Sequence, residues 1–197
     1  MRDFEQQLAF IRELDRLKSV YRQSLVKSDN NRNENSAEHS WHLCVMAHVL
    51  QEYVDEEIDI NRVIRMLLVH DIVEIDAGDT FAFATTTALN DQSEKELRAA
   101  ERIFGLLPAH QRDELLALWL EFEQGETATA KYAKAIDRVV PVLMNLVNDG
   151  GGWRRHTLKR SQLIKRNDFL RISMPRLWDY LVSQIDFAVE QGWISSD

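Results

Sequence analysis

A histidine followed directly by an aspartate, His70-Asp71, ends the strongly apolar run over residues 63–69. An ionisable pair beside such a run is expected to be partly buried, and an unpaired carboxylate is costly to bury. A metal ion compensates for that cost directly, because it binds an imidazole nitrogen and a carboxylate oxygen together. The alternative for this pair alone is a helix-end aspartate that pairs with a nearby arginine, beside a histidine packed in the interior.

Two other segments supply residues that fit a metal site. His39 and His42 are three residues apart on a predicted helix, so one could be a ligand and the other a packed residue. Asp137 has apolar residues on both sides, and aspartate is a poor residue for the middle of a helix. Pro141 cannot donate to the Asp137 carbonyl, and a kink there would present Asp137 to a cavity. The alternative is a buried aspartate bonded to the end of a neighbouring helix.

The candidate metal ligands are therefore His39, His70, Asp71 and Asp137. Their two carboxylates balance a divalent cation, and the mixed nitrogen and oxygen donors suit manganese, iron, cobalt, nickel or zinc, with magnesium as a further option. Glu74 follows His70 by four residues, on the same side of a helix. A carboxylate beside a bound metal is the usual proton acceptor for metal-bound water. The alternative for Glu74 is an acidic residue on a helix surface.

The elements that position these residues are predicted to be helices. Apolar residues at spacings of three and four predict a helix over residues 3–21. Further helices are predicted at about 36–54, 59–75, 91–104, 108–122, 127–147 and 174–191. Polar or irregular segments at 27–34, 79–90 and 150–152 separate them. No segment alternates with the period of two that marks a strand, so the sequence predicts an all-α single domain.

Capping residues set several of these predicted boundaries. Asn35 followed by Glu38 has the spacing of a capping box, which predicts a helix start at residue 36. Asp91 and Glu94 have the same spacing and predict the start of a later helix. Thr127 is expected to cap the helix that follows it.

The composition is that of an ordinary globular chain. Its 197 residues include 24 Lys+Arg and 32 Asp+Glu, and the net charge of −8 argues against a nucleic-acid polymer as partner. The one cysteine, Cys44, excludes an intrachain disulfide and is expected to be an inert packed thiol. No apolar run approaches the ~18 residues of a membrane span, and the N-terminus lacks the apolar core of a signal peptide. We therefore expect a cytoplasmic protein with no membrane partner.

The order of these residues resembles the HD-domain metal-dependent phosphohydrolase superfamily, in which a His, a His-Asp pair and an Asp all lie on helices. The matching runs are Glu38-His39-Ser40, the segment 70–74, Gly78-Asp79-Thr80 and Ala135-Ile136-Asp137. The chain is most similar to the single-domain branch that contains the 5′-deoxynucleotidases. The resemblance implies a compact helical bundle over residues 1–197, with a motif-bearing core at about 8–150 and a C-terminal helical extension at about 153–197.

The resemblance also implies roles for individual residues. It implies that the four candidate ligands bind the metal and that Glu74 handles the attacking water. Asp79 matches a position that contacts the sugar or a second cation near Glu74, and Arg22 matches an arginine near the phosphate. The candidate catalytic residues are thus Glu74 and Asp79, and the candidate substrate-binding residues are Arg22 and Thr80. Where some deoxynucleotidases have an aromatic residue beside the sugar, this chain has Gln23.

The resulting hypothesis is metal-dependent hydrolysis of a phosphomonoester, with a small-molecule nucleotide as substrate and Arg22 as a bidentate phosphate clamp. The alternatives are an HD-type phosphodiesterase or guanosine polyphosphate hydrolase, and a nucleotide-binding regulator without turnover. The segment 70–91 holds no basic residue, which favours a monophosphate. Trp41 and Phe81 or Phe83 could stack a base, although packing is the more frequent role of such residues.

The C-terminal part contains one feature that this hypothesis does not use. Residues 153–171 contain seven basic residues and one acidic residue, Asp168. This composition predicts a solvated helical face or, alternatively, a contact with a partner subunit or an anion. Trp178, Leu181 and Ile185 predict an apolar face that is buried against the bundle or a second copy. A homodimer is the expectation by general frequency.

Overall fold

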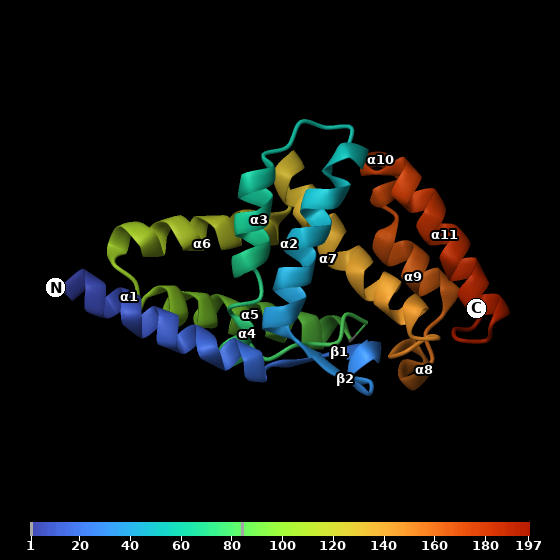
Figure 1. Ribbon diagram of the computed structural model, residues 1–197, viewed down its shortest axis with the longest axis horizontal. Coiled ribbons are helices and arrows are strands. Elements are labelled where there is room, and N and C mark those ends of the chain that lie inside the picture. Colours follow the sequence, from blue (N-terminus) through green and yellow to red (C-terminus); the bar gives the residue numbers. More distant parts are fainter. Residues whose placement is uncertain (1, 84) are drawn as a thin grey trace.

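Helices form most of the computed structural model, which describes residues 2–83 and 85–197 (Figure 1). The long helices are α1 (Arg2–Glu13), α2 (Ser36–Leu50), α3 (Ile60–Val69), α5 (Thr86–Phe104), α6 (Ala109–Gln124), α7 (Ala128–Val147) and α11 (Pro175–Glu190). The short ones are α4 (Glu74–Ala77), α8 (Trp153–His156), α9 (Arg160–Asn167) and α10 (Leu170–Ser173). Three 3₁₀ segments are η1 (Leu14–Ser19), η2 (Lys27–Asp29) and η3 (Gln51–Tyr53). The predicted all-α class is confirmed, with one small sheet added to it.

That sheet is an antiparallel hairpin of β1 (Tyr21–Val26) and β2 (Arg32–Asn35), where the sequence predicted a loop and no strand. The chain reverses through Asn30 and Asn31, whose φ angles of 52° and 58° are left-handed conformations that asparagine tolerates. The buried side chains of the hairpin are Ser24 and Glu34. Because both are polar, the alternation of apolar and polar residues that reveals most strands is absent here.

The predicted helix starts agree with the structure in two cases and differ in a third. Asn35 accepts from the backbone of Glu38, and the Glu38 carboxylate accepts from the Asn35 N–H at 2.7 Å, which confirms the capping box at the start of α2. Thr127 caps α7 as expected. The prediction for α5 is wrong, because Thr85 caps this helix and Asp91 lies within it. A threonine cap earlier in the chain thus sets the start of α5.

The predicted helix over 59–75 is interrupted after α3. Asp59 caps α3, which ends at Val69, and residues 70–73 form turns before the short α4. The apolar pattern continues through these turns, so periodicity alone could not reveal the interruption. The consequence is that His70 and Asp71 lie at a helix end, where both side chains reach the same cleft.

The core that positions the site is centred on α7, which contacts α2, α3 and α6. Its fully buried residues include Tyr132, Ile136 and Val139. Burial of each such side chain contributes roughly 1.5–3 kcal/mol. The Tyr132 hydroxyl also donates to the Ala47 carbonyl at 2.7 Å and ties α7 to α2. These contacts hold the two helices in fixed register, so the polar side chains that they carry are held as well.

The C-terminal elements pack on the opposite side of α7 from α1, α5 and α6, as Figure 1 shows. Leu181 and Ile185 of α11 are completely buried within the chain itself, so their apolar face needs no second copy to cover it. A close turn joins α7 to this part, and a Cβ on Gly152 would lie 3.0 Å from the Gln23 carbonyl oxygen of β1.

Outside these contacts, Cys44 of α2 donates to the Ile64 carbonyl at 3.6 Å, and burial raises the pKa of its thiol to about 11. This agrees with the expected packed, unreactive thiol.

Within the described residues, every helix is too short or too polar to cross a bilayer.

Candidate metal centre and active site

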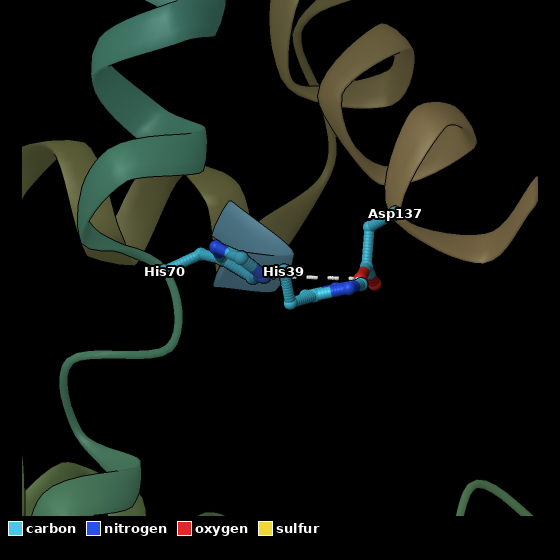
Figure 2. Close-up of side chains that lie close together, drawn as sticks. All are labelled: His39, His70 and Asp137. Carbon is cyan, nitrogen blue, oxygen red and sulfur yellow. Dashed lines mark hydrogen bonds and ion pairs between the residues drawn. The ribbon is translucent and has the colours of Figure 1, made fainter. Parts of the chain in front are cut away.

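Three helices bring two imidazoles and a carboxylate together (Figure 2). His39 is on α2, His70 follows the last residue of α3, and Asp137 is on α7. One possible ligand atom from each residue lies within 4.8 Å of the other two. The Asp137 Oδ1 atom is 3.2 Å from His39 Nε2 and 3.7 Å from His70 Nε2. The structure thus assembles three of the four predicted metal ligands into one cluster.

The surroundings of His70 show how this cluster could hold a cation. Its Nδ1 atom is 2.9 Å from the Leu67 carbonyl oxygen, which can only accept, so Nδ1 carries the proton. The Nε2 atom then faces two carboxylates, with Asp71 Oδ1 at 3.0 Å and Asp137 Oδ1 at 3.7 Å, and without a metal these carboxylates favour a proton on it. Burial opposes a positive charge on His70, but these two carboxylates outweigh it and hold the pKa of His70 well above its usual value. A divalent cation fits this donor set, because it satisfies the nitrogen and both carboxylates at once.

The fourth predicted ligand, Asp71, lies at the edge of the cluster. Its Oδ1 atom faces His70, whereas its Oδ2 atom accepts from Arg22 Nη1 at 2.5 Å. Burial works against its ionisation, but the charges of His70 and Arg22 dominate and lower the pKa of Asp71 to about 2. Asp71 is therefore an ionised carboxylate with one oxygen directed at the cluster and the other held by the arginine.

Glu34 of β2 is a site residue that the sequence did not reveal. Its Oε2 atom lies 3.2 Å from His39 Nδ1, and both side chains are buried. A carboxylate at this nitrogen fixes the tautomer and the orientation of a ligating imidazole. The signal was hidden because Glu34 belongs to the hairpin whose strands lack an apolar pattern.

Glu74 of α4 is held by two partners on different elements. The Ser36 hydroxyl donates to Glu74 Oε2 at 2.5 Å, and Arg22 Nη1 lies 3.4 Å from Oε1. Burial and the nearby charge of Asp71 raise the pKa of Glu74 well above its usual value. Its protonated form is therefore favoured over that of a free carboxyl, as expected for a group that takes up a proton.

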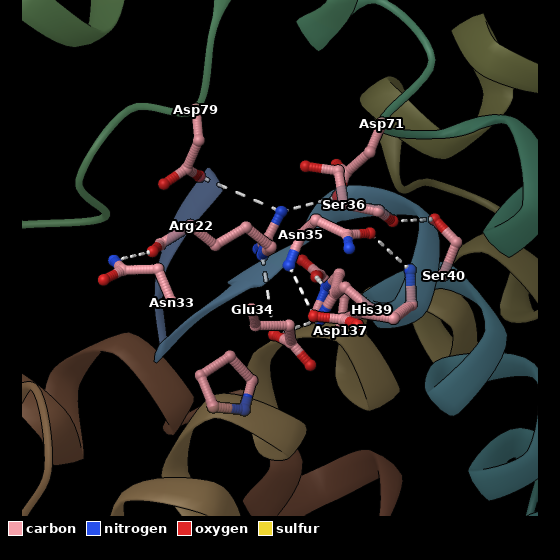
Figure 3. A network of polar contacts seen from close by, with 12 residues as sticks. Arg22, Asn33, Glu34, Asn35, Ser36, His39, Ser40, Asp71, Asp79 and Asp137 are labelled. Atoms are coloured by element: carbon pink, nitrogen blue, oxygen red, sulfur yellow. Dashed lines mark hydrogen bonds and ion pairs between the residues drawn. The ribbon is translucent and has the colours of Figure 1, made fainter. Parts of the chain in front are cut away.

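Arg22 of β1 has its cationic head among carboxylates rather than free in the cleft (Figure 3). Besides Asp71 and Glu74, it faces Asp79 at 3.8 Å and Glu34 at 4.0 Å, and 13% of its side chain is exposed. Burial raises the pKa of Asp79. The predicted site residues Arg22 and Asp79 are thus brought to the cluster, but the donors of Arg22 are directed at protein carboxylates.

A cleft of about 360 Å³ opens onto the cluster, a size that suits a small-molecule ligand. Its lining includes Asp79, Thr80, Phe81 and Phe83. The Phe81 ring stacks on His156 with centroids 4.0 Å apart. The prediction that Trp41 could stack a base in this cleft is wrong, because Trp41 is 66% exposed and is not part of the lining.

Basic residues also line this cleft, although the segment 70–91 holds none and the sequence argument for a monophosphate rested on that segment. Lys134 and Arg138 come from α7, and Arg166 comes from α9. Arg166 belongs to the segment that was expected to be a solvated face, and it is partly buried, whereas Arg154, Arg155, Lys159, Lys165 and Arg171 of that segment are exposed. The sequence argument failed because these cations are distant from His70 along the chain.

Comparison with known proteins places this geometry in a family. The family model of the HD domain matches residues 14–178. The chain belongs to the HD domain family. Human 5′-deoxynucleotidase HDDC2 is 34% identical to it over 136 residues, which are 69% of this chain and 65% of the human protein. The corresponding protein of Xenopus laevis is 32% identical over 139 residues, covering 71% of this chain and 67% of that protein.

Solved structures of HD domain proteins extend the comparison to the whole chain. A crystal structure from Magnetospirillum magnetotacticum, described as a predicted metal-dependent phosphohydrolase, has a TM-score of 0.89 and 45% identity, and the match covers 98% of this chain and 99% of that one. An HD-domain phosphohydrolase from Listeria innocua has a TM-score of 0.59 and 18% identity over 95% of this chain and 83% of its own, which shows a shared fold. The chain spans slightly less than two thirds of the human relative.

Proposed function

We propose that this HD domain protein is a divalent-metal-dependent phosphomonoesterase that hydrolyses deoxynucleoside or nucleoside 5′-monophosphates to nucleoside and phosphate. The observation that carries the proposal is the Nε2 atom of His70, which lies 3.0 Å from Asp71 Oδ1 and 3.7 Å from Asp137 Oδ1 beside a cleft of about 360 Å³. The relatives named 5′-deoxynucleotidase support the reaction class and suggest the substrate.

The residues proposed to hold the metal are His39, His70, Asp71 and Asp137. When bound there, a divalent cation supplies a Lewis acid and lowers the pKa of a water molecule. The choice among manganese, iron, cobalt, nickel, zinc and magnesium is left to metal analysis. A second cation beside Glu74 would have to compete with Arg22, whose guanidinium already supplies positive charge between the neighbouring carboxylates.

The proposed roles of the remaining residues follow from their contacts. Glu74 accepts the proton of the attacking water, with the Ser36 hydroxyl on Oε2 and Arg22 near Oε1 holding its carboxylate in place. Arg22 keeps Asp71 and Glu74 in place, and Asp79 with Thr80 borders the cleft where a sugar would lie.

Phosphate release from a panel of nucleotides tests this proposal. The full chain is stripped with a chelator, reloaded with manganese, cobalt, magnesium or zinc, and assayed on ribo- and deoxynucleoside 5′-monophosphates. Metal-dependent release is expected from 5′-monophosphates and not from the matched 3′-monophosphates, with the ribo-to-deoxy ratio reporting on the sugar. A fully metal-loaded protein that releases no phosphate from any of them would refute the proposal. Hydrolysis of a diester such as bis(p-nitrophenyl) phosphate would instead indicate a phosphodiesterase.

A further inference from the structure

Arg138 of α7 and Arg166 of α9 form an adjacent pair on the wall of the cleft. Arg138 Nη1 donates to the Arg166 carbonyl at 3.2 Å, and Arg166 Nη1 donates to the Ala82 carbonyl at 3.2 Å. Each guanidinium also lies over an aromatic ring, with Arg138 Cζ 4.8 Å from the Phe169 centroid and Arg166 Cζ 5.6 Å from the Phe83 centroid. Both cationic heads are therefore held in defined positions.

Neither arginine of this pair forms an ion pair with a carboxylate among residues 2–83 and 85–197, although both are partly buried. Their hydrogen bonds within this part of the chain use one nitrogen of each, and a guanidinium has five N–H donors. Burial lowers the pKa of both arginines, the charge of Arg138 lowers that of Arg166 further, and the charge of Asp137 opposes both shifts. Two partly buried cations with free donors are stabilised by an anion that binds both.

The other wall of the cleft has no uncompensated positive charge with which to bind an anion. Arg22 is surrounded by four carboxylates, from Glu34, Asp71, Glu74 and Asp79, so its charge is already compensated. A phosphate that approaches the cluster meets these carboxylates and needs further positive charge from the protein. In the cleft, that charge is available at the arginine pair.

We infer that Arg138 and Arg166 form an anion subsite that binds a phosphate group of the substrate. The planar fork of arginine donors matches phosphate oxygens in bidentate geometry. The group is either the phosphate that is hydrolysed or a second phosphate on the same molecule. The identity of the ligand rests on the proposed function, so the first test uses inorganic phosphate and needs no turnover.

In that test, inorganic phosphate is titrated into the chelator-stripped chain and followed by ³¹P NMR. Arg138→Gln and Arg166→Gln are each expected to weaken binding about tenfold, and Arg166→Lys is expected to retain part of it because the charge remains. Arg171→Gln is the matched control, since Arg171 is an exposed arginine of α10. Thermal unfolding shows that the variants are folded. An unmodified chain that does not bind phosphate, or folded variants that bind it equally well, would overturn the subsite.

The second test distinguishes the two phosphates in the metal-loaded enzyme. A nucleoside 5′-monophosphate is compared with the 3′,5′-bisphosphate of the same nucleoside, and kcat and KM are measured for each. An equal loss of kcat/KM on both substrates in Arg166→Gln assigns the subsite to the hydrolysed phosphate, whereas a loss confined to the bisphosphate assigns it to the second one. Unchanged constants on both would contradict the subsite and leave the hydrolase proposal intact. Phosphate binding that depends on Arg138 and Arg166, without any turnover of the nucleotides, would support the subsite and contradict the hydrolase proposal.

Discussion

The two walls of the cleft differ in their balance of acidic and basic side chains. On the wall formed by the hairpin and by the segment after α3, carboxylates outnumber cations, and Arg22 is surrounded by them (Figure 3). On the wall formed by α7 and α9, the Arg138 guanidinium donates to the Arg166 backbone carbonyl, and neither arginine forms an ion pair in the described part of the chain. A protein with a net charge of −8 can therefore present a local cationic surface to an anionic substrate. This contrast agrees with the proposals that a cation binds at the acidic wall and an anion at the basic wall.

Removal of a metal ligand should have the largest effect on this contrast. His70→Ala takes the nitrogen from the cluster, and we expect it to abolish metal binding and metal-dependent phosphate release. The variant should also lose the stabilisation that metal gives the folded chain, which is about 2.7 kcal/mol at a metal concentration of 100 times Kd. Metal analysis and thermal unfolding with and without added metal measure both effects. His42→Ala, at a half-buried imidazole of α2 outside the cluster, is the matched control. Stoichiometric metal in His70→Ala would show that the cluster is not the metal site.

Glu74→Gln should affect the reaction and spare the metal. The amide keeps the shape of the side chain but cannot accept the proton, so kcat should fall about 10²- to 10⁴-fold. Phosphate release and metal content are measured on the same preparation. If turnover persists near the original rate, the proton acceptor is another group.

Glu34→Gln tests whether the buried carboxylate on the hairpin supports the cluster through His39. The loss of such an outer partner typically lowers metal affinity or activity about 10- to 100-fold. Competition with a fluorescent chelator gives the affinity of the variant directly. An unchanged affinity would limit the role of Glu34 to compensating the charge of Arg22.

Cys44 lies on neither wall, so its substitution or alkylation is expected to have the smallest effect on phosphate release. Because burial raises its pKa to about 11, the thiol is neutral at pH 8, and its alkylation by iodoacetamide should be slow in the folded chain. The rate should rise about tenfold for each pH unit up to that pKa as the thiolate fraction grows. Cys44→Ala should leave phosphate release unchanged. Fast labelling at pH 8 without unfolding would show that this face of α2 opens readily.

The candidate ligands were predictable because their signals are local. His70 and Asp71 follow an apolar run, and Asp137 stands out in an apolar helix, so each is unusual within a few residues of sequence. The boundaries of α2 and α7 were equally accessible, since their capping residues adjoin the helices that they begin.

What could not be predicted depends on contacts between distant segments or on polar interiors. The hairpin was missed because its inward side chains, Ser24 and Glu34, are polar and leave no hydrophobic period. Arg166 was assigned to a solvated face because nothing near it in sequence shows that α9 packs beside α7. The break after α3 was hidden for the opposite reason, because apolar residues continue through it.

The turn at Gly152 has a consequence for the shape of the whole site. The backbone of the turn approaches the Gln23 carbonyl so closely that a Cβ would lie 3.0 Å away from it. Gln23 follows Arg22 directly, and the turn leads into the segment that carries His156 and Arg166. The spacing between the acidic and basic walls is thus set at a point where the chain has no side chain at all. A larger residue at Gly152 would press its Cβ against the Gln23 carbonyl, so that β1 and the turn would have to move apart by a few tenths of an ångström.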